Sequence, residues 1–108
     1  PQDRDVCECA CRALYAIAWR TQLLYYSLPA CVVILQGVRN HTTDPAVSLW
    51  ACRLIALLAG ASRANQRTMA TAGVCVVVSQ VLVRHCDSDH GVCDAACRAL
   101  LSLARDSP

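Results

Sequence analysis

The sequence predicts an all-α protein of stacked three-helix repeats, folded as a right-handed α-solenoid. A nine-residue phrase that begins with Ala-Cys-Arg occurs at residues 10–18, 51–59 and 96–104, so its copies start 41 and 45 residues apart. A period of about 40 to 47 residues is typical of stacked helical repeats. Apolar side chains recur inside each copy at helical spacing, and the segments between the copies also correspond to one another.

The third helix of each repeat is predicted from this phrase. Val6, Val47 and Val92 stand at the same distance before each copy, which extends the helix to about four turns. In the middle copy one face is expected to be buried: Val47, Ala51, Leu54, Ile55 and Leu58. A flank of small residues, Ser48, Cys52 and Ala59, would let a neighbouring helix approach closely.

Residues 21–33 correspond to residues 65–77, and this predicts a short helix, a corner and a second helix before each third helix. Pro29 and Gly73 stand at the two corners. Ser62 or Asn65 is expected to cap one short helix, and Asp44 and Asp89 the third helices. His41 and His85 align where the second helices end. The domain 1–108 therefore divides into a partial repeat, 1–19, and two full repeats, 20–60 and 61–108.

A rival interpretation makes residues 31–35 and 74–78 buried parallel strands, because both segments are rich in β-branched side chains. We reject it because two strands do not form a stable sheet among so many helices. The glycine-rich phosphate loop expected after the first strand of such a fold is also missing from the sequence.

Composition narrows the class of protein. Of the 108 residues, 56% are hydrophobic and 17% charged, which predicts a folded domain. The net charge of +2 gives no overall basic field, so no nucleic-acid partner is expected. All ten basic residues are arginines, whose planar guanidinium groups suit carboxylates, phosphates and aromatic faces.

Most of the nine cysteines lie inside periodic apolar helices, where they are expected to be free thiols that pack as small apolar side chains. Their number is odd, and residues 1–5 show no charged-then-apolar signal segment. An intracellular protein, in the cytoplasm or the nucleus, is therefore expected. No apolar run reaches the roughly 18 residues that span a bilayer, so no membrane association is expected.

Several of these features resemble the armadillo repeat family, of the importin-α and β-catenin type. They are the stretch from Asn65 to Gly73 with Ala72-Gly73-Val74 at its corner, the acidic residue before the third helix, and the pattern Ala51-x-x-x-Ile55-x-x-Leu58-Ala59. That pattern recurs from Ala10 and Ala96. The resemblance covers nearly the whole chain and implies a concave groove, lined by the third helices, that holds an extended peptide.

In the nuclear-import members of that family, a Trp and an Asn four residues later clamp the peptide. At the Trp positions this chain has Arg12, Arg53 and Arg98, and at the Asn positions it has Ala16, Leu57 and Ser102. Since neither clamp is present, a basic import signal is not the expected ligand. A ladder of arginines favours an acidic or phosphorylated segment.

Trp50 lies one turn before Arg53 and is expected to stack on its guanidinium group or to anchor an apolar side chain of the ligand. The alternative is that the arginines pair locally. Arg12 follows Glu8 by four residues and Arg98 follows Asp94 by four, whereas Arg53 has Leu49 at that position. Both interpretations stay open from the sequence.

A zinc site would use His85, Cys86, His90, Cys93 and Cys97. The spacing of Cys93 and Cys97 is repeated by Cys7 and Cys11, but the middle repeat has Ser48 and Cys52 there, which favours repeat packing over metal binding. No metal or cofactor is therefore expected. Residues 87–90 carry the side chains of a nucleophilic triad only as neighbours in a short polar connection, so no enzyme is expected either.

The sequence thus predicts a non-enzymatic module that binds an extended acidic peptide through Arg12, Ala16, Trp50, Arg53, Leu57, Arg98 and Ser102. One alternative is a scaffold segment of a longer solenoid that forms homo-oligomers through apolar end helices, where Val6, Leu14 and Ile17 would be exposed. A zinc-stabilised protein is the other alternative.

Overall fold

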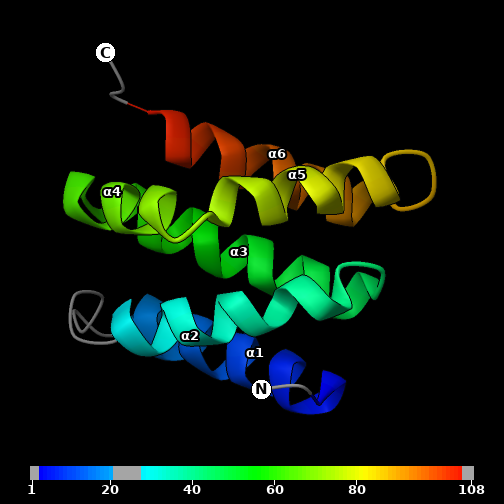
Figure 1. Ribbon diagram of the computed structural model, residues 1–108, viewed down its shortest axis with the longest axis horizontal. Coiled ribbons are helices and arrows are strands. Elements are labelled where there is room, and N and C mark those ends of the chain that lie inside the picture. The colour runs from blue at the N-terminus through cyan, green and yellow to red at the C-terminus, as the bar shows by residue number, and fades with distance from the viewer. Residues whose placement is uncertain (1–2, 21–27, 106–108) are drawn as a thin grey trace.

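The computed structural model describes residues 3–20 and 28–105, and within these ranges the fold is all-α with no strand (Figure 1). The helices are α1 (Arg4–Arg20), α2 (Leu28–Val38), α3 (Pro45–Ala61), α4 (Arg63–Thr71), α5 (Val74–His85) and α6 (His90–Ala104), with a 3₁₀ turn η1 (Arg39–His41). The short helix predicted from residue 21 of the first full repeat lies outside the described residues.

The helices form two layers. In one layer α3 lies between α1 and α6 and packs against both. In the other, α2 and α5 lie nearer the viewer in Figure 1 and contact each other, and α4 precedes α5 at one end. The whole measures 32 × 32 × 23 Å. The three copies of the repeated phrase thus fold into the three helices of one layer.

The buried face predicted for α3 is confirmed. All five of its residues have at most 1% of their surface exposed, and the predicted flank of small residues is buried as well. Asp44 caps α3, as predicted: its carboxylate accepts hydrogen bonds from the backbone N–H groups of Ala46 (3.0 Å) and Val47 (3.1 Å). The hydroxyl of Ser48 donates to the carbonyl oxygen of Thr42 at 3.0 Å. The small side chain of Ser48 therefore fits the close contact with the neighbouring helix, and its hydroxyl group keeps a hydrogen-bond partner.

The second full repeat contains the three predicted helices, α4, α5 and α6. Of the two candidate caps for α4, Ser62 is the one used, since its hydroxyl accepts from Asn65 N–H at 3.0 Å. Asn65 itself is buried and donates from Nδ2 to the carbonyl oxygen of Leu58 at 2.9 Å. The carboxylate of Asp89 caps α6 by accepting from Val92 N–H at 3.1 Å, as predicted.

Gly73 forms the predicted corner between α4 and α5, with a φ of +79° that only glycine adopts without strain. A Cβ at this position would lie 2.6 Å from Nη2 of Arg39, so the guanidinium group of this η1 residue packs directly against Gly73. The other predicted corner residue, Pro29, is the second residue of α2.

Both segments of the rejected strand interpretation lie inside helices, residues 31–35 in α2 and 74–78 in α5. Val77, Val78 and Val81 of α5 are at most 3% exposed. Burial of these side chains against the neighbouring helices outweighs the weak helix propensity of valine.

Arg4 joins the start of α1 to the start of α3. Its guanidinium group forms ion pairs with Asp44, with Asp5 (2.7 Å) and with Glu8 (2.8 Å). The hydrogen bond from Arg4 and those from the backbone hold the pKa of Asp44 below its ordinary value. The same pairs raise the pKa of Arg4, which stays charged in any case.

On the outer side of α1, Val6 and Ile17 are exposed as predicted, whereas Leu14 packs against the core. No described helix is by itself long and apolar enough to cross a bilayer. Only α4 and α5 taken together reach that length, and they meet at a bend of 76°.

Candidate binding groove

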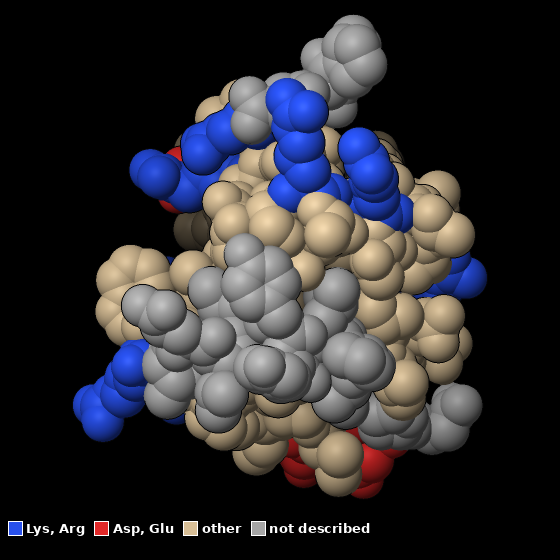
Figure 2. All heavy atoms as spheres, turned by 90° about the vertical axis from the view of Figure 1, so that its left-hand side faces the viewer, with Lys and Arg blue, Asp and Glu red and all other residues tan. Residues whose placement is uncertain are grey.

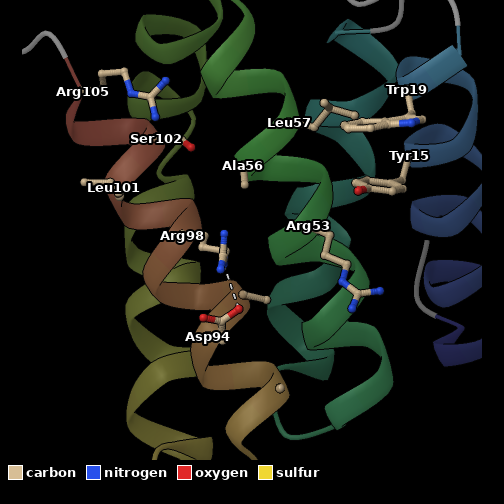
Figure 3. Close-up of a pocket in the computed structure, with 12 residues that line it drawn as sticks. Tyr15, Trp19, Arg53, Ala56, Leu57, Asp94, Arg98, Leu101, Ser102 and Arg105 are labelled. Atoms are coloured by element: carbon tan, nitrogen blue, oxygen red, sulfur yellow. Dashed lines mark hydrogen bonds and ion pairs between the residues drawn. The ribbon is translucent and has the colours of Figure 1, made fainter.

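A hollow of about 500 Å³ lies over α3, between α1 and α6 (Figure 3). Its floor comes from α3, with Arg53, Ala56 and Leu57. One wall comes from α1, with Tyr15 and Trp19. The other wall is α6 and its C-terminal end, with Gly91, Asp94, Ala95, Arg98, Leu101, Ser102 and Arg105. The volume is within the range of ligand sites, about 300 to 1,000 Å³.

A second hollow of about 500 Å³ adjoins the first and shares Tyr15 and Trp19 with it. The further residues that line it are Arg12, Ala13, Ala16, Arg20 and Trp50. We call the two hollows together the groove. All seven residues that the sequence singled out line it: four in the first hollow and Arg12, Ala16 and Trp50 in the second.

Trp50 is the centre of a cluster of arginine and aromatic side chains. The guanidinium carbon of Arg53 lies 4.9 Å from the centroid of its ring, and that of Arg12 lies 5.2 Å away. The ring of Tyr15 meets Trp50 edge-on at 5.8 Å and stacks on Trp19 at 6.2 Å. The predicted stacking of Trp50 and Arg53 is thus confirmed. Because Trp50 is already in contact with two guanidinium groups, its chief effect is to hold them in place.

Trp19 is the aromatic residue of the groove that is accessible to a ligand. It is 69% exposed, and in Figure 3 it stands with Tyr15 on the α1 side of the hollow. The sequence analysis missed both residues. A signal was available, since Arg12, Tyr15, Ala16 and Trp19 follow one helical face at the spacing i, i+3, i+4, i+7.

Local ion pairs form at two of the three ladder positions. Arg98 pairs with Asp94 at 2.8 Å and Arg12 with Glu8 at 3.4 Å, as the alternative interpretation predicted. Arg53 has no ion pair within residues 3–20 and 28–105, and its guanidinium group lies over the ring of Trp50. The Arg53 charge is therefore fixed in position while no described acid neutralises it.

The first hollow carries an excess of positive charge, with Arg53, Arg98 and Arg105 against the single carboxylate of Asp94. Arg105 was missed by the sequence analysis, although it follows Arg98 by seven residues on the same face. On the face drawn in Figure 2, basic side chains lie mainly in the upper part and acidic ones mainly at the bottom. A positive field of this kind attracts acidic ligands.

The cysteines and histidines follow the sequence predictions only in part. Cys7, Cys11 and Cys52 are buried, as expected of core thiols, and burial raises the pKa of Cys52 to about 12. Cys9, Cys75, Cys86 and Cys97 are exposed, so fewer of the described thiols lie in the core than the sequence predicts. In the described part of the chain, no three His, Cys, Asp or Glu side chains are placed to hold a metal ion.

Comparisons of the chain with protein-family models, with curated proteins and with solved structures found no match. The functional argument therefore depends on the residues of the groove.

Proposed function

We propose that this protein is an armadillo-like solenoid segment that binds an extended acidic segment of another protein in its groove, without catalysing a reaction. The observation that supports this proposal most directly is the position of Arg53. Its guanidinium group is held on the face of Trp50, has no acidic partner among the described residues, and lies at the floor of the groove. A fixed cation of this kind is suited to bind a carboxylate or a phosphate of a ligand.

The dimensions of the groove suit a short extended segment. Packed helices lie about 8 to 10 Å apart, and an extended chain advances about 3.3 Å per residue, so roughly six residues would cross α1, α3 and α6. An apolar or aromatic ligand side chain would lie against Trp19 on the α1 wall. Acidic side chains further along would reach Arg53 on the floor and Arg98 or Arg105 on the α6 wall.

The local ion pairs do not oppose this binding. The pair between Arg98 and Asp94 is exposed on both sides, and such surface pairs contribute only about 0 to 1 kcal/mol. Arg98 can therefore exchange Asp94 for a ligand carboxylate at small cost. Arg12 is more engaged, since it contacts both Glu8 and the ring of Trp50. We expect Arg53 to contribute most to binding and Arg12 least.

Self-association is the second candidate function, and the exposed Val6 and Ile17 on the outer side of α1 favour it. These two apolar side chains lie outside the groove residues, so the two candidates use different surfaces. A molecular mass that rises with protein concentration, together with an unoccupied groove, would support this scaffold function.

The test is the binding of acidic, phosphorylated and basic peptides of about ten residues, followed by intrinsic fluorescence. The chain has two tryptophans, Trp19 and Trp50, and both line the groove, so occupancy changes their emission. We expect Arg53→Glu to weaken acidic peptides by about tenfold or more while helical content by circular dichroism stays unchanged. Arg63→Glu is the matched control, because it makes the same charge change at an exposed position of α4, outside the groove.

The proposal is wrong if basic peptides bind as well as acidic ones, or if Arg53→Glu and Arg63→Glu reduce the affinity for the acidic peptide equally. Absence of binding by every peptide would also reject it and would favour the scaffold function. Trp19→Phe, which leaves Trp50 as the reporter, checks that the emission change comes from the groove.

A further inference from the structure

A separate hollow of about 710 Å³ lies on the exposed face of α5, beside the segment that contains η1 and the turn after it. Residues of two segments line it: Arg39, Thr42 and Thr43 from the first, and Cys75, Val76, Ser79, Gln80, Val83 and Arg84 from α5. None of these residues lines the groove, which belongs to the layer of α1, α3 and α6. We call this region the α5 face.

The α5 face contains an apolar stripe. Val76 is 56% exposed and Val83 is 78% exposed, although both are large aliphatic side chains. They are seven residues apart on one helix, so they lie on the same side, two turns or about 10.5 Å apart. Between them stand the small or uncharged side chains of Ser79 and Gln80. Two exposed valines in register along a hollow mark a surface suited to contact with a partner.

Two arginines flank this stripe. Arg84 follows Val83 on α5, and Arg39 lies on the opposite side of the hollow, where its guanidinium group packs on Gly73. Within the described residues neither arginine has an ion pair, and the lining of the hollow contains no acidic side chain. Asp87 follows Arg84 by three residues but lies outside the lining of the hollow, and Asp44, which follows Arg39 by five residues, is engaged by Arg4 and by the start of α3. The α5 face is thus apolar along its centre and positive at its edges.

We propose that the α5 face is a second docking surface, and that its occupant is a short amphipathic helix of a partner protein with acidic residues along the edges of its apolar stripe. A helix laid along α5 would place side chains at i and i+7 against Val76 and Val83, in the way that packed helices interlock. Carboxylates beside that stripe would reach Arg39 and Arg84.

An extended segment suits this surface less well. Side chains of a strand alternate between two faces, so only every second one would meet the apolar stripe, which runs along the axis of α5. A helix laid along α5 offers one continuous apolar face, which matches the two-turn spacing of the valines.

The test uses the whole chain, labelled with ¹⁵N, and a blocked helical peptide of about 15 residues with leucines along one face and glutamates beside them. We expect chemical-shift changes at Val76, Gln80 and Val83, while the emission of the two groove tryptophans stays constant. The same peptide with lysine in place of glutamate should bind about tenfold more weakly.

Single substitutions distinguish binding at the α5 face from binding in the groove. Val83→Asp and Arg84→Glu each change an exposed side chain and should weaken the glutamate peptide by about tenfold. Val33→Asp is the matched control for the valine, since Val33 is also 56% exposed but lies on α2. Arg63→Glu is the control for the arginine, because Arg63 is exposed on α4 and lines neither the groove nor the hollow on α5. Both controls should leave the affinity for this peptide unchanged.

Three results would each overturn the proposal: equal affinity for the lysine peptide, shift changes centred on Tyr15 and Trp19, or no shift change up to millimolar peptide. These results say nothing against the groove, whose test uses other peptides and a fluorescence signal. Conversely, if no extended peptide bound the groove, the proposal that the α5 face is a docking surface would be unaffected.

Discussion

The Nε2 atom of His85 lies 2.8 Å from the carbonyl oxygen of Thr42, 43 residues earlier in the chain. The hydroxyl of Ser48 donates to the same oxygen at 3.0 Å. His85 ends α5 and is buried, and Thr42 lies in the turn before α3. One carbonyl group therefore connects the end of a second helix with the start of a third helix of the preceding repeat.

We expect His85→Ala to destabilise the protein by about 1 to 3 kcal/mol, because it removes one of the two partners of the Thr42 carbonyl oxygen and leaves a cavity where the buried imidazole was. Urea unfolding followed by circular dichroism measures this. His90→Ala is the control, since His90 is exposed at the start of α6 and should change stability by less than about 0.5 kcal/mol. Equal effects of the two substitutions would show that the contact with Thr42 adds nothing to stability.

Asp44 should contribute a pH-dependent part of the stability. The hydrogen bond from Arg4, and those from Val47 and Ala46, lower the pKa of Asp44 in the folded state below its ordinary value of 3.8. The unfolded chain therefore binds the proton first as the pH falls. The contribution is fully present above about 3.8 and is lost as the pH falls through the lower pKa of the folded state.

We expect Asp44→Asn to lower the melting temperature at neutral pH, since the amide keeps the cap but loses the charge attracted to Arg4. The difference from the unsubstituted protein should shrink below pH 3.8. Asp89→Asn is the matched control, because Asp89 caps α6 in the same way but has no arginine ion pair among the described residues. A constant difference at every pH would show that the Arg4 pair does not stabilise the fold.

Thiol labelling should distinguish two classes of cysteine. Burial raises the pKa of Cys52 to about 12, so at pH 8 almost none of it is the reactive thiolate, and reagents cannot reach it. Cys75 and Cys97 are exposed and should react with iodoacetamide within minutes. Mass spectrometry after digestion locates the label, and urea-unfolded protein, in which all react, is the control. Labelling of Cys52 as fast as Cys75 in the folded chain would contradict its burial.

Trp50 should stabilise the fold and position Arg53. We expect Trp50→Ala to cost about 2 kcal/mol, less than the 3 to 5 of a fully buried tryptophan, because it removes contacts with Arg12, Arg53 and Tyr15. Trp50→Phe keeps an aromatic face and should cost about half as much. Chemical denaturation measures both, and an effect below about 0.5 kcal/mol for Trp50→Ala would show that the stacking is not stabilising.

The sequence was sufficient for features that depend on neighbours along one helix. The buried face of α3 could be predicted because a 3.6-residue period places Ala51, Ile55 and Leu58 on one side. The caps at Asp44 and Asp89 could be predicted because a cap bonds to backbone two or three residues away. Trp50 and Arg53 are also only three residues apart.

Features that depend on contacts between helices could not be predicted from the sequence, or could be predicted only in part. Asn65 could have capped α4, but its amide reaches Leu58 and Ser62 is the cap. Most cysteines were expected to pack as apolar side chains, but four of those described are exposed, because their place in an apolar helix does not say whether they face a neighbouring helix. Trp19 and Arg105 line the groove only because α1 and α6 lie on either side of α3.

The sequence by itself determined that the chain is helical, where α3 and α6 begin, and that one arginine recurs in each copy of the phrase, because these follow from local bonding and short-range periodicity. The tertiary structure decided what those arginines do. The ion pairs of Arg12 and Arg98 are local to their own helices, but packing placed Arg12 of α1 on the ring of Trp50 in α3 and set Arg53 at the floor of a hollow between α1 and α6. It also left Val76 and Val83 uncovered on α5. Contacts of this kind join side chains far apart in sequence, which only the folded chain brings together.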